Sequence, residues 1–479
     1  MLLRIALAWV LCLLCCNAVL AVDGKKPNVL FIAVDDLRPE LGCYGQPMMK
    51  TPNIDQLASQ GIVFDRAYCN VPVCGASRAS LMTGLRPTAT RFLTYTTWAE
   101  QDAPGITPLH THFKQHGYHT ISNGKVLHQR EDHANGWSEA VWRPRGTGFY
   151  VLPENIQLNL TRGKKEGRQR GPATEAADRP DEKYDDYETA TKSIADLRKL
   201  AKQDEPFFLA VGFYKPHLPF VAPQKYWDLY DRAKIALPQV KGRPQDAPPQ
   251  AMHTSGELRA YSDIPPTGPL DEATTRRLIH GYFACISFTD SQVGRLLSEL
   301  EKLGLADDTI VVLWGDHGWN LGEHGMWCKH CCFETSMRVP LIVKAPQIAG
   351  GKKTSGLTEF VDIYPSLCEL TGLPMPEHLH GRSFAPLLKN PELPWKPEAI
   401  GRFGLGDTIR TATHRFTEYT QPAGKFIANM LYDHTTDPRE SMNLSQRKEQ
   451  AELVSELTQR LHAGKGRAAS AITADKARP

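Results

Sequence analysis

The sequence lacks an excess of charge of either sign. It contains 56 lysine and arginine residues against 53 aspartate and glutamate residues, which gives a formal net charge of +3. Loss of Arg4 with an N-terminal leader would lower the net charge from +3 to +2. A chain so close to neutrality offers no electrostatic basis for binding nucleic acid, so we expect no nucleic-acid partner.

The sequence also lacks an internal repeat, and no second Cys/His pair of zinc-finger spacing stands near Cys328-Lys329-His330-Cys331-Cys332. Because a zinc finger needs both pairs, we interpret this run as structural thiols or a local disulfide. Cysteine itself is not scarce, since 11 are present and three of them fall in residues 1–21. If one of the other eight is chemically modified, seven remain, and at least one must stay free or pair outside the chain.

A long hydrophobic run stands at the N-terminus. Residues 1–21 carry a single charge, Arg4, and end in Asn17-Ala18-Val19-Leu20-Ala21. Small residues before Ala21 and the interruption at Asn17 indicate a cleaved signal peptide rather than a retained anchor. We therefore expect a secreted or periplasmic protein, lysosomal in an animal, with no stable membrane span in the mature chain.

The 479 residues, 41% hydrophobic and 23% charged, are enough for a large core and a smaller module. Short apolar runs predict buried strands, and amphipathic spacing predicts helices. The predicted strands are residues 27–34, 62–64, 207–213, 309–314 and 338–343. The predicted helices are residues 51–59, 107–116, 188–203 and 276–303. We expect residues 150–187 to form a charged surface insertion and residues 236–272 to form an irregular, proline-rich loop.

Polar residues directly follow three of these strands. They are Asp35-Asp36, Lys215-Pro216-His217 and Asp316-His317. Folds that alternate strands and helices place their chemistry at the carboxyl ends of strands. Adjacent carboxylates also need a cation or a proton to coexist. Each group taken alone is equally consistent with a solvated turn or a structural histidine.

A cysteine stands at the start of a predicted helix in Val-Cys-Gly-Ala-Ser-Arg, residues 73–78. A thiol at that place lies at the positive end of the helix dipole. A lone cysteine is more often a small buried apolar residue. Here, however, residues 74–87 resemble the type I sulfatase signature C-x-P/A-S-R followed by x-x-x-L-T-G-x-R-P. Ala76 occupies the position where proline is commoner.

The remaining motifs follow the order found in type I sulfatases of the alkaline phosphatase superfamily. They resemble the iduronate-2-sulfatase branch in particular, through Gly-Lys-Val-x-His at 124–128, Lys-Pro-His at 215–217, Asp-His-Gly-Trp at 316–319 and Gly-Glu-His-Gly at 322–325. The resemblance implies an α/β fold with a large mixed sheet flanked by helices. It also implies a smaller C-terminal antiparallel sheet that ends in a helix over residues 450–462, followed by a disordered tail. The expected division is signal peptide 1–21, catalytic domain 22–390 and small α+β domain 391–479.

The resemblance further implies a sulfuric ester hydrolase in which a formylglycine-generating or radical maturase oxidises Cys74 to formylglycine. The implied ligands of one calcium ion are Asp35, Asp36, Asp316, His317 and an oxygen of modified Cys74. The implied catalytic residues are Cys74, Arg78, Lys125, His128, His217 and Lys329. Substrate contacts are expected from Lys125, His217, Trp319 and Lys329, with Tyr95 and Trp98 as further aromatic platforms.

In this scheme Arg78 and Lys125 orient the nucleophile, and His128 acts as a base. His217 and Lys329 bind sulfate and protonate the leaving alcohol. The implied substrate is a sulfated oligosaccharide or polysaccharide, with a 2-O-sulfated uronic acid favoured.

Two alternatives stay open at this stage. A phosphoesterase of the same superfamily would normally use serine or threonine as the nucleophile and need a second metal site. A non-catalytic glycan-binding protein would keep Cys74 as a thiol. Comparing phosphate esters with sulfate esters tests the first alternative, and the chemical state of Cys74 tests the second.

Overall fold

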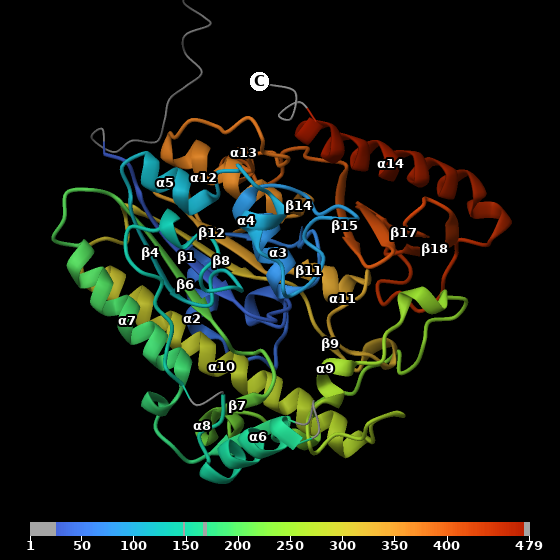
Figure 1. Ribbon diagram of the computed structural model, residues 1–479, viewed down its shortest axis with the longest axis horizontal. Coiled ribbons are helices and arrows are strands. Elements are labelled where there is room, and N and C mark those ends of the chain that lie inside the picture. Colours follow the sequence, from blue (N-terminus) through green and yellow to red (C-terminus); the bar gives the residue numbers. More distant parts are fainter. Residues whose placement is uncertain (1–24, 147–148, 166–169, 474–479) are drawn as a thin grey trace, which may run out of the picture.

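The computed structural model describes residues 25–146, 149–165 and 170–473 (Figure 1). The predicted signal peptide, residues 1–21, lies outside these residues. Among the described helices, none has both the length and the apolar character needed to cross a bilayer.

A seven-stranded mixed sheet forms the centre of the molecule. Its strands lie in the order β13 (Lys352–Thr354), β2 (Ile62–Phe64), β12 (Leu341–Lys344), β8 (Thr309–Gly315), β1 (Asn28–Val34), β6 (Phe207–Phe213) and β4 (His119–Gly124). Strands β8, β1, β6 and β4 are parallel neighbours, whereas β12 runs antiparallel to β2 and β8. The predicted strands at residues 27–34, 62–64, 207–213 and 309–314 are confirmed. Their continuous apolar character is typical of strands that are covered on both faces.

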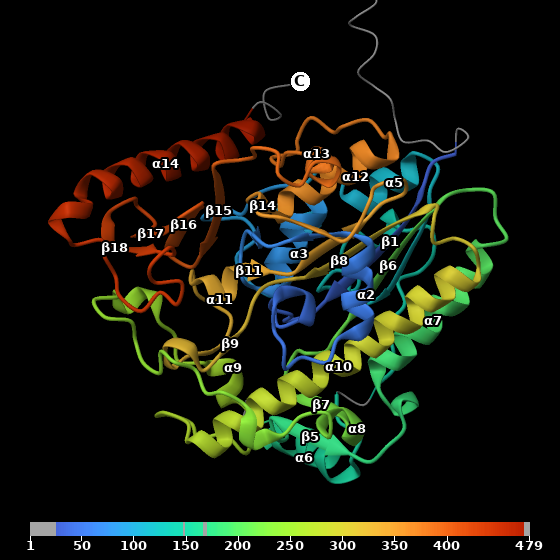
Figure 2. The ribbon, with the colours of Figure 1, turned by 180° about the vertical axis from the view of Figure 1, so that it is seen from behind.

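Alternate residues of β1 pack into two different cores. Leu30 and Ile32 belong to one cluster, and Phe31 and Ala33 belong to the other, because successive side chains of a strand point to opposite faces. Helices α2 (Pro52–Gln60), α7 (Asp185–Leu200) and α10 (Glu272–Lys302) contribute to the first cluster. Helices α3 (Cys74–Thr83), α5 (Leu109–Gln115) and α12 (Ile363–Thr371) contribute to the second. The two helix groups lie on opposite sides of the sheet (Figures 1 and 2).

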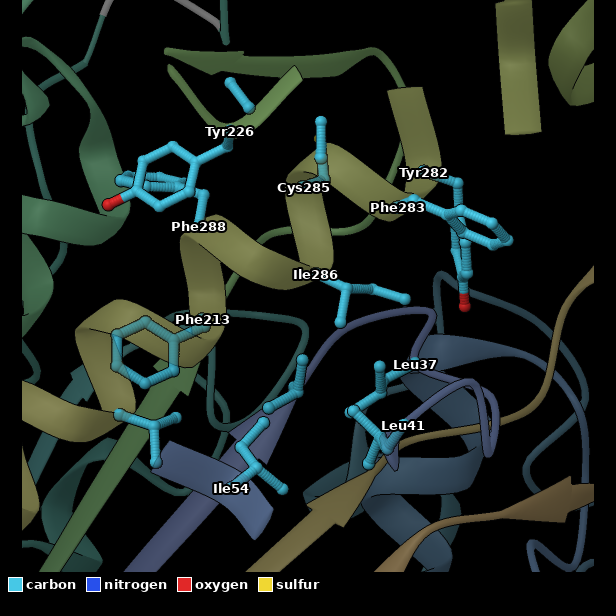
Figure 3. Packing of buried hydrophobic residues seen from close by; sticks show 14 of the residues in the cluster. Leu37, Leu41, Ile54, Phe213, Tyr226, Tyr282, Phe283, Cys285, Ile286 and Phe288 are labelled. Carbon is cyan, nitrogen blue, oxygen red and sulfur yellow. The ribbon is translucent and has the colours of Figure 1, made fainter. Parts of the chain in front are cut away.

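Helix α10 packs against the segment that follows β1. Figure 3 shows Ile286 of α10 directed toward Leu37 and Leu41. The hydroxyl of Tyr282, also on α10, donates a hydrogen bond of 2.7 Å to the main-chain oxygen of Asp36. The helix therefore holds in place the turn that carries the aspartate pair.

The predicted strand at residues 338–343 is wrong in one respect, since it is two strands in two sheets. Strand β11 (Arg338–Val339) pairs with β3 (Ala67–Tyr68), and only β12 joins the large sheet. Pro340 separates them, because proline has no N–H to donate to a sheet. Strand β14 (Thr358–Glu359) completes the sheet of β11 and β3.

The expectation for residues 150–187 is also wrong in part. This segment contains α6 (Pro153–Lys165) and β5 (Thr174–Ala177) ahead of α7. Strand β5 pairs with β7 (Phe220–Pro223), and Tyr150 and Ala177 are buried. By contrast, residues 236–272 are largely irregular, as predicted, with the short helix α9 (Gly256–Arg259) near their end. The other short elements are α4 (Ala99–Asp102), α8 (Gln224–Trp227), β9 (Asn320–Leu321), β10 (Trp327–Cys328), α11 (Glu334–Met337) and α13 (Ala385–Lys389).

A separate four-stranded antiparallel sheet follows, as expected for the C-terminal part. Its strands are β15 (Glu398–Phe403), β16 (Gly406–Thr411), β17 (His414–Thr420) and β18 (Phe426–Asp433), and α14 (Ala451–Thr473) packs against it. The expectation of a disordered tail after Gly464 is wrong for residues 465–473, which continue α14. Ala468, Ala469 and Ala471 fall in this stretch, and alanine is the strongest helix former.

Glu334 links the C-terminal sheet to the rest of the molecule. Its carboxylate lies 3.2 Å from Arg410 and 2.5 Å from Arg415, and it accepts a hydrogen bond of 2.9 Å from Tyr68. We expect Glu334→Gln to lower the free energy of unfolding by about 3 kcal/mol, because two buried guanidinium groups lose a countercharge. Urea denaturation measures this change. Glu456→Gln on exposed α14 is the control, with an expected change below about 0.5 kcal/mol.

Candidate active site

The polar residues predicted at strand ends meet at one edge of the large sheet. Asp35-Asp36 follows β1, residues 215–217 follow β6, Asp316-His317 follows β8, and Lys125 follows β4. These strands are parallel neighbours, so their carboxyl ends lie side by side. Strand β2 runs in the same direction as β8, since both are antiparallel to β12, and it leads toward Cys74 at the start of α3.

Arg78 stands behind this edge, fully buried. Its Nη2 lies 3.2 Å from Oδ1 of Asp35, and its Nε lies 2.9 Å from Oδ2 of Asp316. Its Nη1 donates to the main-chain oxygens of Lys125 and Val126. Burial raises the pKa of Asp35, but Lys125 and Arg78 outweigh this effect and hold the pKa well below its usual value. Arg78 therefore helps to keep Asp35 ionised, and it orients both buried carboxylates.

Four potential metal ligands gather in front of Arg78. Ligand atoms of Asp35, Asp36, Cys74 and His317 all lie within 4.8 Å of one another. Within the described residues, Nε2 of His317 is buried and has no hydrogen-bond partner, although it lies 3.3 Å from Oδ1 of Asp36. Such an orphaned nitrogen among carboxylates fits a bound divalent cation.

Asp316, the fifth expected ligand, lies beside this group rather than within it. Its Oδ1 accepts a hydrogen bond of 2.9 Å from the main-chain nitrogen of Asp36. The same oxygen lies 3.6 Å from Nε2 of His317. Asp316 thus helps to fix the backbone of Asp36, which has a left-handed φ of 59°.

Cys74 is the first residue of α3 and lines a pocket of about 880 Å³. Burial raises the pKa of its thiol, but Lys125 and Lys329 reverse this effect, so the pKa falls below its ordinary value. A Cβ at the next residue, Gly75, would meet the main-chain oxygen of Tyr95 at 2.3 Å. Glycine at this position therefore allows the main chain at Tyr95 to pack directly against the start of α3.

The same pocket contains His128, His217, Lys125 and Lys329, so the structure brings all the expected catalytic side chains to one region. It also adds Glu257, which no motif in the sequence indicates. Oε1 of Glu257 lies 3.2 Å from Nε2 of His217, and Oε2 lies 2.9 Å from Nζ of Lys329. Glu257 therefore couples these two cationic groups.

Trp319 departs from the expectation of a substrate contact. Its side chain is wholly buried, and its ring lies beneath the Lys329 ammonium at 4.8 Å. Tyr95 does line the pocket and is 60% exposed, whereas Trp98 is half-buried outside the lining. The expectation that Trp319 contacts the sugar is therefore wrong. Its ring packs against the Lys329 side chain instead.

Lys215 does not line the pocket that contains Cys74. Its Nζ donates to the main-chain oxygens of His217 at 3.0 Å and Pro219 at 2.6 Å. This lysine braces the turn that presents His217. The cysteines at 328, 331 and 332 are buried free thiols, in agreement with a structural role.

Comparison with known proteins identifies the family to which the chain belongs. A sulfatase family model matches residues 27–373, and a model for the C-terminal region of N-sulphoglucosamine sulphohydrolase matches residues 322–466. The chain belongs to the sulfatase family. It is therefore an enzyme that hydrolyses sulfate esters. The family and the fold are those that the sequence motifs predicted.

The relatives of this sulfatase include two iduronate 2-sulfatases. The mouse (Mus musculus) enzyme is 35% identical over 386 residues, covering 73% of this chain and 69% of its own. The human (Homo sapiens) enzyme is 31% identical over 503 residues, covering 87% and 90%. Among solved structures, a 2-O GAG sulfatase superposes with a TM-score of 0.70 at 23% identity, covering 94% of each chain.

Proposed function

We propose that this sulfatase removes sulfate from a sulfated saccharide, with a 2-O-sulfated uronic acid as the favoured substrate. Cys74 converted to formylglycine would provide the nucleophile, and one calcium ion would assist. The observation that carries the proposal is the place of Cys74, at the head of α3, beside three potential metal ligands and under the influence of Lys125 and Lys329. Similarity to iduronate 2-sulfatases supports the choice of substrate.

The two groups that the family implies fit these residues. Asp35, Asp36, His317 and an oxygen on residue 74 would hold the cation, with Asp316 orienting Asp36. Carboxylate oxygens suit calcium, and the bound ion would neutralise charge on the sulfate oxygens. Formylglycine would supply hydrated aldehyde hydroxyls as nucleophiles, which a thiol cannot offer.

The chain's own residues would divide the remaining work. Lys125 and Lys329 line the pocket beside Cys74, where they would stabilise negative charge that develops on the sulfuryl oxygens and so lower the barrier. Burial lowers the pKa of His128 to about 3, with Lys125 adding to the effect, so the imidazole is neutral and able to accept a proton. His217 has a raised pKa because Asp36 and Glu257 outweigh burial, so it can donate a proton to the leaving alcohol.

His128→Ala should lower turnover by about 10²- to 10⁴-fold, because the pocket loses its neutral base. Because the folded pKa of His128 is depressed, the wild-type base stays unprotonated throughout pH 5–8. Titration of this residue should therefore produce no activity loss in that range. Steady-state rates across this pH range measure both effects. His119→Ala, at the other end of β4 and outside the pocket, is the matched control and should keep near wild-type turnover.

Metal removal provides a further prediction. The chelated protein, given Ca²⁺ at about 100 times its Kd, should gain about 2.7 kcal/mol in unfolding free energy, seen as a higher melting temperature. Asp36→Asn should lose most of this shift, and Asp204→Asn, an exposed control, should keep it. An Asp36→Asn protein with the full calcium response would contradict the assigned ligand set.

Substrate choice is tested by measuring sulfate release from uronic acid sulfated at O2 and from the same sugar sulfated at other positions. The 2-O-sulfate is expected to have the highest kcat/KM, and a phosphate ester of the same sugar is expected to be a poor substrate. Faster cleavage of the phosphate ester would favour the phosphoesterase alternative. Faster cleavage of another regioisomer would correct the position of the sulfate.

We also propose export of the chain with cleavage near Ala21, followed by a catalytic domain over residues 22–390 and a small domain over residues 391–479. The separate sheet that begins with β15 at Glu398 supports the second boundary. N-terminal sequencing of the mature protein tests the cleavage site.

A further inference from the structure

The charges that line the active-site pocket are not all compensated by the protein. Lys125 contacts Asp35, and Lys329 lies 2.9 Å from Glu257. Arg143 lines the same pocket, yet within the described part of the chain no carboxylate lies within ion-pair distance of it. Glu257, the carboxylate that lines the pocket, is already engaged by Lys329 and by a histidine. Among the described residues, Arg143 therefore lacks the carboxylate partner that Lys125 and Lys329 each have.

Arg143 is held in place by neutral partners. Its Nη2 donates to the main-chain oxygens of Leu127 at 2.6 Å and His128 at 3.1 Å. Its Nε is buried and has no hydrogen-bond partner among the residues that the structure describes. Burial lowers the pKa of this guanidinium, and Tyr214 and Asp35 offset the effect only in part. A fixed guanidinium with an unused donor is well suited to a carboxylate or a sulfate.

We propose that Arg143 binds a second anionic group of the substrate, a carboxylate or a second sulfate, distinct from the sulfate that is cleaved. This inference builds on the proposed function, because it assumes cleavage of a sulfate ester at residue 74. A pocket of about 880 Å³ has the size of saccharide-binding sites and can hold one sugar that carries both groups. A substrate with a single anionic group would leave Arg143 without a countercharge.

Arg170 is the competing candidate on the wall of the pocket. Its Nη1 lies 3.1 Å from the hydroxyl of Tyr261, and its guanidinium lies 5.5 Å from the centroid of that ring. Arg170 is exposed, so water screens its charge, whereas Arg143 is partly buried. We therefore assign the second anion to Arg143 and use Arg170 as a comparison.

The test compares three sulfate esters with the matured enzyme. They are a 2-O-sulfated uronic acid, its methyl ester, which keeps the sulfate but lacks the carboxylate charge, and the corresponding hexose with a second sulfate at O6. The measured quantity is the ratio of kcat/KM for each dianionic substrate to kcat/KM for the methyl ester. Arg143→Gln should lower at least one ratio by about 10- to 100-fold, because charge-assisted hydrogen bonds are lost. The anion is a carboxylate if the ratio for the uronic acid falls more. It is a sulfate if the ratio for the disulfated hexose falls more.

Arg145→Gln removes the same charge from an exposed residue outside the pocket and should keep both ratios at the wild-type values. Arg143→Lys keeps the charge but not the forked donors, so its ratios should fall between those of Arg143→Gln and the wild type. Unchanged ratios in Arg143→Gln would overturn the proposal. The proposal would also be overturned if the kcat/KM ratios fell in Arg170→Gln and stayed unchanged in Arg143→Gln.

Calorimetric titration of the Cys74→Ser protein with the same three compounds separates this inference from the proposed function. Binding needs no turnover, so the Kd ratios report on Arg143 even if the wild-type enzyme cleaves none of the esters. Loss of discrimination in the Cys74→Ser/Arg143→Gln double variant supports the second anion site. Equal Kd ratios with and without Arg143 would contradict it.

Discussion

The Cys74→Ala variant is expected to lose sulfate-ester hydrolysis by about 10⁴-fold or more, because removal of a nucleophile reduces turnover to what binding and charge stabilisation alone supply. Cys74 stands at the head of α3, only 3% exposed, and shares its pocket with Lys125 and Lys329. Its replacement should leave folding nearly unchanged, since the side chain is small and the helix is retained. Sulfate release measures the rate, and a thermal melt measures the stability.

The matched control is Cys43→Ser, which removes a thiol that is half-buried and lies outside the pocket. It should keep near wild-type turnover, and this separates the loss of one particular cysteine from the loss of any thiol. Substantial turnover in Cys74→Ala, with the background of other hydrolases removed, would show that the nucleophile lies elsewhere.

The Arg78→Met variant is expected to lose about 3–5 kcal/mol of unfolding free energy in the absence of metal. Arg78 is fully buried, and its removal would leave Asp35 and Asp316 without the guanidinium that pairs with both. Asp316 already has a raised pKa because of burial, so the loss should raise it further. Urea denaturation in a chelating buffer gives the stability, and sulfate release should fall as well because two oriented carboxylates shift.

Arg130→Met serves as the control for Arg78→Met. Its guanidinium is 56% exposed and lies 3.8 Å from Glu131, so the expected change is below about 0.5 kcal/mol. The double variant Arg78→Met/Asp316→Asn should lose less stability than the two single changes added together, because the two side chains interact. An additive double variant would show that Arg78 does not act through Asp316.

Much of the site could be predicted because its residues stand next to continuous apolar strands. Residues 207–213 are apolar throughout, which predicts a buried strand and places His217 at its carboxyl end. Asp35 and Asp316 follow strands of the same kind, and the parallel pairing of β1 with β8 brings these aspartates together. Local sequence places each group at the end of a strand, and the strand order of the parallel sheet decides which ends meet.

Glu257 could not be predicted in this way. It stands on a four-residue helix in a proline-rich stretch, and its contact with Lys329 depends on how that stretch folds back across the sheet edge. Arg143 is similar, since its hydrogen bonds to Leu127 and His128 join two loops. Trp319 shows the reverse error, because its position in a motif does not reveal that its ring packs beneath Lys329.

Peptide mass spectrometry across residues 73–78 shows whether the nucleophile is made from Cys74. The protein should come from its own host or from cells that also express a formylglycine-generating or radical maturase. We expect a peptide whose mass matches formylglycine at position 74. An unmodified thiol in every molecule, despite an active maturase, would contradict the account and favour a glycan-binding protein without turnover.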